Sequence, residues 1–153
     1  MAKFVLKATA FVMIIFILDR IIKSFFLSGF EWHGEVFSLY LVINKGVAFS
    51  MFAFLGEWLK FIQIAIILLL LVFIYREKSF FERHAVAVGI LFGAGCSNVL
   101  DRFLYGGVVD YFAWHYWFNF AVFNFADVMI DLAVVMIAVK MIFERQDKAI
   151  KAK

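Results

Sequence analysis

Four long apolar stretches alternate with shorter segments that hold most of the charged residues. The apolar stretches cover about residues 4–27, 59–75, 85–105 and 121–143. Because an α-helix rises about 1.5 Å per residue, roughly 20 residues cross the ~30 Å hydrocarbon core of a bilayer. The pattern therefore predicts an all-α integral membrane protein with four transmembrane helices, arranged as a single membrane domain over residues 1–153.

The segment between the first two stretches, about residues 28–58, departs from this helical pattern. Residues 35–43 are rich in β-branched and aromatic side chains, and the turn signal Asn44-Lys45-Gly46 follows them. We therefore expect a small β-rich extracytoplasmic segment at the membrane surface. The lysine-containing tail, residues 144–153, is predicted to be disordered or helical.

The composition supports the membrane class. Hydrophobic residues make up 66% of the chain and charged residues only 18%, and the mean hydropathy is +0.96. A soluble domain of this size could not bury so much apolar surface. The net charge of +3 is too small to indicate a nucleic-acid partner, and the single cysteine excludes an internal disulfide bond.

The distribution of cations predicts an orientation. Lys and Arg accumulate in cytoplasmic segments of membrane proteins, and here they collect near both termini and within residues 76–84. Both termini are therefore expected in the cytoplasm, with residues 28–58 and 106–120 outside. Within the first stretch, an apolar run from Ala8 to Leu18 follows Lys3 and Lys7, as in a signal peptide, but no small-x-small cleavage site comes after it, so we expect a retained helix.

Polar residues associated with the spans share one depth. In the predicted orientation they all fall in the outer half of the membrane or just outside it: Asp19, Lys23, Asn98, Asp101, Arg102, Asp110, Asn124, Asp127 and Asp131. An ionisable group in a bilayer costs several kcal/mol unless it is paired or faces water. For the pairs Asp19 with Lys23 and Asp101 with Arg102, contacts between helices and a direct part in a site are equally good interpretations.

Asp110 and Asp127 have no cation within one helical turn along the chain. Two carboxyl groups that meet in a low-dielectric site cannot easily both ionise, so the pair would hold one proton and could activate water for hydrolysis. The alternative is that both are interfacial, with Asp127 at a helix start that favours negative charge. Spacing alone leaves both interpretations open.

Five motifs in order resemble the lipoprotein signal peptidases (signal peptidase II), and the likeness runs over nearly the whole chain. They are Asp19-x-x-x-Lys23, Asn44-Lys45-Gly46-Val47-Ala48-Phe49, Gly93-x-x-x-x-Asn98-x-x-Asp101-Arg102, Val109-Asp110-Tyr111 and Phe123-Asn124-Phe125-Ala126-Asp127. The chain departs from the usual family pattern at Ala94 and Ser97, where glycines are common, and before Phe123, where a proline is common.

The resemblance implies an aspartyl endopeptidase of the bacterial inner membrane, with its site toward the extracytoplasmic side. Its substrates would be lipid-modified prolipoproteins, cut just before a diacylglyceryl-modified cysteine, and its other partners membrane lipids. The implied catalytic residues are Asp110 and Asp127. Positions that bind substrate or orient the site would be Asn44, Gly46, Asn98, Arg102, Asn124, Asp19 and Lys23. We expect a monomer without metal or other cofactor.

Two other functions stay open on the residues. Asp127-x-x-x-Asp131 could hold a divalent metal, as in a membrane lipid-headgroup transferase, although the upstream elements of such enzymes are missing. The outer carboxylates could also serve a small ion-coupled transporter subunit, but the polar residues stop at half depth. Cys96 has no nearby base, and the three histidines lack metal-ligand spacing.

Overall fold

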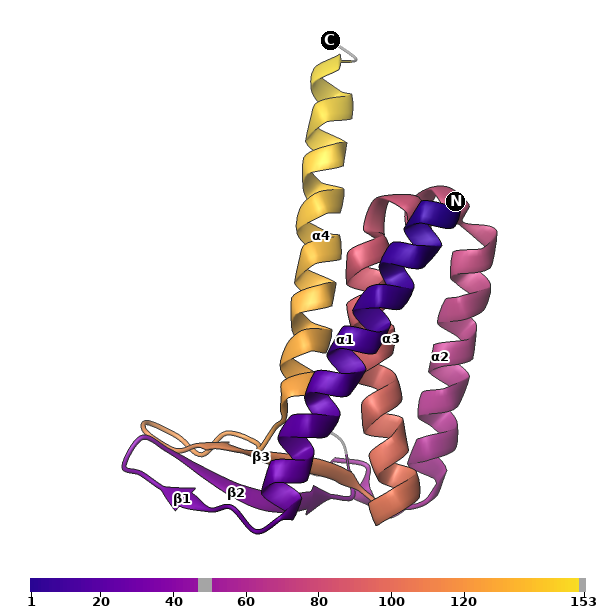
Figure 1. Ribbon diagram of the computed structural model, residues 1–153. Helices are drawn as coiled ribbons and strands as arrows, with labels where there is room; N and C mark the ends of the chain where they lie inside the picture. Colours follow the sequence, from indigo (N-terminus) through magenta and orange to yellow (C-terminus); the bar gives the residue numbers. More distant parts are fainter. Residues whose placement is uncertain (47–50, 152–153) are drawn as a thin grey trace.

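The computed structural model describes residues 1–46 and 51–151, with side chains described as far as residue 147. In this part of the chain, four long helices run roughly alongside one another and a small sheet lies across one end of them (Figure 1). The helices are α1 (Ala2–Leu27), α2 (Trp58–Arg76), α3 (Lys78–Tyr105) and α4 (Phe125–Lys151). A short 3-10 helix, η2 (Ala53–Leu55), precedes α2.

One expected helix boundary was wrong, and another coincides with a kink. α3 starts at Lys78, but its backbone angles are not helical at His84, so a second helical segment begins at residue 85, where a span was expected to start. α4 begins at Phe125 instead of residue 121, because Phe123 forms an isolated bridge with Phe112.

The sheet has three antiparallel strands in the order β1-β2-β3. They are β1 (Trp32–His33), β2 (Phe37–Asn44) and β3 (Val108–Trp114). The expected β-rich segment is therefore present, but β3, its longest-range partner, falls in the segment after α3, where no strand was predicted. The register sets Val42 opposite Asp110 and Asn44 opposite Val108, so the end of β2 lies beside the start of β3.

α3 packs against each of the other three helices and is the most buried of them. Gly89 and Gly93 face α1 so closely that an added Cβ would lie 2.4 Å from the carbonyl oxygen of Ala8 and 2.6 Å from that of Val12. On the side toward α4, Ala94 and Ala126 are fully buried. Small residues thus bring three helix backbones together behind the sheet.

Among the described residues, α2 and α3 are long and apolar enough to cross a membrane. α2 is mostly exposed, with Leu69 at 69% and Phe61 at 51%. Apolar side chains are similarly exposed along α1 and α4. Such a surface suits an integral membrane protein; the crossing of a bilayer by α1 and α4 stays a prediction.

Candidate active site

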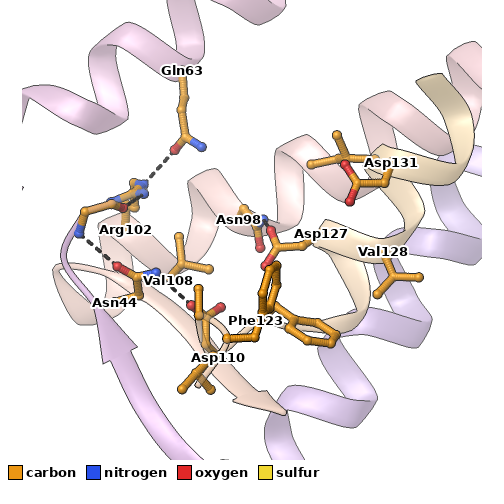
Figure 2. A pocket seen from close by; sticks show the side chains of 15 residues that line it. Asn44, Gln63, Asn98, Arg102, Val108, Asp110, Phe123, Asp127, Val128 and Asp131 are labelled. Atoms are coloured by element: carbon orange, nitrogen blue, oxygen red, sulfur yellow. Dashed lines mark hydrogen bonds between the residues drawn. The ribbon is translucent and has the colours of Figure 1, made fainter. Parts of the chain in front are cut away.

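A cavity of about 460 Å³ lies where the helices meet the sheet (Figure 2). Asp110 on β3 and Asp127 on α4 reach into it from separate elements. The other polar residues that line it come from β2, the turn after it, α2, α3 and α4: Asn44, Gly46, Gln63, Asn98, Arg102 and Asp131.

Asp110 is only 1% exposed, and amide donors reach both of its carboxylate oxygens. Asn44 Nδ2 donates to Oδ2 at 2.9 Å, and Asn124 Nδ2 donates to Oδ1 at 2.7 Å. Burial, together with the nearby negative charge of Asp127, raises the pKa of Asp110 to about 7, although the two amide hydrogen bonds and the charge of Lys23 act to lower it. This carboxyl group can therefore hold its proton at a pH where an ordinary aspartate is ionised.

Asp127 is fixed by the way α4 begins. Asn124 is the N-cap: its Oδ1 accepts the backbone N–H of Asp127 at 2.9 Å, and Asp127 Oδ2 accepts the backbone N–H of Asn124 at 3.2 Å. This reciprocal pair is a capping box with an aspartate in the position where glutamate is common. Asn98 Nδ2 donates to the remaining oxygen, Oδ1, at 2.9 Å.

Asn124 joins the two aspartates. Its Nδ2 lies 2.7 Å from Asp110 Oδ1 and its Oδ1 holds the backbone of Asp127, so one buried amide contacts both halves of the pair. The same Nδ2 also lies 3.2 Å from Asn98 Oδ1 and from the carbonyl oxygen of Val109.

Behind this pair lies a buried ionic network centred on Lys23. Its ammonium group is 2.7 Å from carboxylate oxygens of Asp19 and Asp101 and from Asn98 Oδ1, which matches its three hydrogens. Asp101 also accepts the backbone N–H of Val109 at 3.1 Å and pairs with Arg20.

Asp19 extends this network to the start of α4. It accepts the backbone N–H of Ala126 at 3.0 Å and the hydroxyl of Ser97 at 2.6 Å. Asp19 and Lys23 do not line the cavity; they hold the elements that do.

Arg102 forms the opposite wall of the cavity. Its side chain is 5% exposed, donates to Gln63 Oε1 at 2.7 Å and donates to the carbonyl oxygen of Gly46. Gln63 was missed by the sequence analysis; the only available signal was a single amide in the middle of an apolar stretch. Of the Asn44–Phe49 motif, residues 47–49 lie outside the described residues.

Two of the three departures from the family pattern, Ala94 and Ser97, fit the packing. Ala94 is fully buried in the core between helices. Ser97, where a glycine is usual, adds a hydroxyl that hydrogen-bonds Asp19. Asp131 lies one turn beyond Asp127 and also lines the cavity.

Comparison with known proteins agrees with the motifs. The profile of the Signal peptidase (SPase) II family matches residues 11–143. A protein named lipoprotein signal peptidase from Wolinella succinogenes is 51% identical over 87% of this chain and 91% of its own length. One from Helicobacter pylori strain P12 is 50% identical over 91% and 89%, and one from Campylobacter jejuni strain 81116 is 44% identical over 95% and 94%.

Two solved structures share the fold. Both are described as bacterial membrane enzymes determined by the in meso method. The first aligns with a TM-score of 0.76 at 24% identity over 92% of this chain and 90% of its own, and the second with a TM-score of 0.70 at 23% identity over 88% and 91%. The family match, the identity to these relatives and the order of the motifs place the chain in the signal peptidase II family of aspartic endopeptidases.

Proposed function

We propose that the chain removes signal peptides from diacylglyceryl-modified prolipoproteins, cutting just before the lipidated cysteine with a water molecule activated between Asp110 and Asp127. The observation that carries the proposal is the bridge through Asn124, which contacts both aspartates at the edge of one cavity. The relatives named lipoprotein signal peptidase supply the substrate class.

The environments of the two aspartates suggest their roles. Asp110, with a pKa near 7, keeps its proton in part of the population at neutral pH and can donate it toward the carbonyl oxygen or the leaving amine. Asp127, held by hydrogen bonds from Asn98 and from the backbone of Asn124, is then the base that takes a proton from water. Collapse of the tetrahedral intermediate then breaks the C–N bond, and the new amine leaves with the proton from Asp110.

The membrane supplies much of the substrate positioning in this proposal. A signal peptide and two acyl chains would hold the scissile bond near the outer boundary of the bilayer, and the cavity would lie at that depth if four helices span the membrane with both termini in the cytoplasm. We place the enzyme in the bacterial inner membrane as a monomer whose site is reached sideways from the lipid.

Variants at the two aspartates test the chemistry. Asp110→Asn and Asp127→Asn keep the shape of each side chain but remove a titrating group, so each should lower cleavage of a purified diacylglyceryl-modified precursor by at least about a thousandfold. Asp147→Asn, an exposed change in the tail, should cleave at the parent rate. Unchanged cleavage by either cavity variant, at parental yield in the membrane, would contradict the assignment.

Chelation of metal separates this proposal from a metalloprotease or a metal-dependent transferase. Cleavage should continue in excess EDTA. A loss that added zinc or magnesium restores would overturn the aspartate mechanism.

A further inference from the structure

A second cavity, of about 350 Å³, lies between the N-terminal end of α1, the kinked start of α3 and the middle of α4. This is the end of the bundle opposite the sheet, where Figure 1 places the N-terminus. Its lining includes Phe4 and Lys7 from α1, Arg83 and His84 from α3, and Met136 and Lys140 from α4. None of these residues belongs to the candidate active site.

The charge around this cavity is unbalanced toward the positive. Glu82, which also lines it, pairs with the N-terminal amine at 3.2 Å, and Arg83 Nε pairs with Glu144 at 3.3 Å. Lys7 has no ion pair among the described side chains. Lys140 donates to the backbone carbonyl oxygen of Arg83 at 2.5 Å, which leaves two of its ammonium hydrogens.

His84 adds a polar atom without a partner. It is 4% exposed, and its Nδ1 lies 2.9 Å from the carbonyl oxygen of Phe80, so Nδ1 is the donor and carries the proton. In the neutral ring Nε2 is then an acceptor, and it is the buried side-chain nitrogen that has no hydrogen-bond partner among the described residues. A hydroxyl that enters the cavity lies beside this ring and can supply the donor.

The kink brings a helix start to the same place. Backbone angles at His84 are not helical, so a second segment of α3 begins just after it, and residues 83–87 all line the cavity. The start of a helix carries a partial positive charge that favours an anion. The cavity thus combines cations from three helices with a helix start and an acceptor for a hydroxyl group. These features suit a ligand that carries an anionic group and a hydroxyl.

We propose that this cavity binds the headgroup of an anionic glycerophospholipid of the cytoplasmic leaflet, with the phosphate held by Lys7, Arg83 and Lys140 and a headgroup hydroxyl donating to His84. A lipid fits better than a soluble anion because apolar side chains, including Phe4, Val86 and Met136, share the lining of the cavity. Leu6 and Val139, which follow and precede lining residues along α1 and α4, are 73% and 45% exposed. This surface can hold acyl chains while basic side chains hold the phosphate. The inference rests on the proposed membrane orientation and is independent of the proposed catalysis.

Binding to the full chain in detergent micelles, followed by native mass spectrometry, tests the site. Phosphatidylglycerol should bind with a dissociation constant at least about tenfold lower than that of phosphatidylcholine. Lys7→Gln should weaken phosphatidylglycerol binding roughly fivefold, as expected for the loss of one cation near a phosphate. Arg76→Gln, which removes a cation outside this cavity at the same end of the bundle, should leave it unchanged.

Three results would overturn the proposal: equal binding of the two lipids, equal effects of the Lys7 and Arg76 variants, or binding of soluble glycerol phosphate as tight as that of the lipid. Phosphatidylmethanol, an anionic phosphodiester without a hydroxyl, tests the part assigned to His84. The parent protein should bind phosphatidylglycerol severalfold more tightly than phosphatidylmethanol, and His84→Phe should abolish that preference. Persistence of the preference in the variant would contradict the hydrogen bond to His84.

Discussion

In the proposed mechanism, the titration of one buried side chain, Asp110, sets the pH range of cleavage. Its pKa stands near 7 because burial disfavours the carboxylate, while the hydrogen bond from Asn44 works in the opposite direction. If Asp110 acts as the proton donor, its proton must be present in the active form. As far as Asp110 is concerned, activity should therefore be retained below neutral pH and lost as the pH rises through the pKa of Asp110.

The pH profile gives a direct measurement of this role. We expect kcat/KM for a lipidated precursor to fall above about pH 7 with a slope of one proton. Asn44→Ala removes a donor that stabilises the carboxylate, so the pKa of Asp110 should rise and the alkaline limb should move to higher pH. An alkaline limb that stays in place in Asn44→Ala, or moves down, would exclude Asp110 as the group that titrates.

Asn124 combines two functions that a substitution can separate. Serine is also a good N-cap, so Asn124→Ser should keep the start of α4, with a melting temperature close to that of the parent. The serine side chain has no amide to donate to Asp110, so the hydrogen bond that connects Asn124 with Asp110 is lost. We expect kcat to fall about 10- to 100-fold. Asn124→Ala should lose both the N-cap of α4 and the hydrogen bond to Asp110. Equal activity of the serine variant and the parent would show that the bridge to Asp110 is dispensable.

Residues could be predicted from the sequence where their chemistry conflicts with their surroundings. Asp110, Asp127 and Asn98 stood out because charge and amide groups are costly near a bilayer, and the motifs supplied their order. Gln63 could not be assigned in this way. Its partner, Arg102, lies 39 positions away, and only the packing of α2 against α3 brings the two side chains together.

At the scale of elements, the close contact of α1 with α3 determines where the site residues stand. Gly89 and Gly93 let the α1 backbone approach, and the same stretch of α1 leads to Asp19 and Lys23. Helix contacts built on small residues depend on backbone proximity, so a single methyl group can disturb them.

A pair of glycine variants tests this contact. The Cβ of Gly93→Ala would lie 2.6 Å from the backbone of Val12, and we expect a loss of about 1–3 kcal/mol of stability and a lower melting temperature in micelles. Gly95→Ala is the matched control, because its Cβ would meet only Ile67 Cδ1 at 3.8 Å and alanine favours the helix. Equal melting temperatures for the two variants would mean that α1 and α3 can separate without cost.

Helices and strands were predictable where the local sequence pattern defines them. They were missed or misplaced where a partner far away in the chain defines them. The apolar stretches indicated the helices. β3 is rich in aromatic and β-branched residues, which favour a strand, but its pairing depends on hydrogen bonds from β2, about 70 residues earlier in the chain. The predicted start of α4 was too early for a related reason. Phe123 pairs with Phe112, so the helix begins only after its N-cap, Asn124.

At the scale of the whole molecule, the Lys23 network joins elements from both ends of the chain. It links α1 to α3, and through Asp19 it reaches the first turn of α4. The Asp19–Lys23 pair does more than connect two helices, although it does not line the cavity. It fixes the elements that carry Asp110 and Asp127. The sequence could place these residues at one depth, but it could not show this connectivity.

Removing the central cation should destabilise the whole bundle. Lys23→Met leaves Asp19 and Asp101 buried without their shared partner, and we expect a loss of about 3–5 kcal/mol of stability. Lys60→Met breaks a pair with the exposed Glu57 and should cost at most about 1 kcal/mol. Thermal unfolding in micelles compares the two, and a Lys23 variant as stable as the Lys60 variant would contradict the central role of the network.

The hydrogen bond from the backbone of Ala126 to Asp19 joins residues that are 107 positions apart. During synthesis on the ribosome, the first three helices therefore emerge without the group that completes Asp19 and without Asp127 itself. In the proposed mechanism, a chain that stops before α4 therefore lacks one of the two catalytic aspartates and should not cleave a precursor.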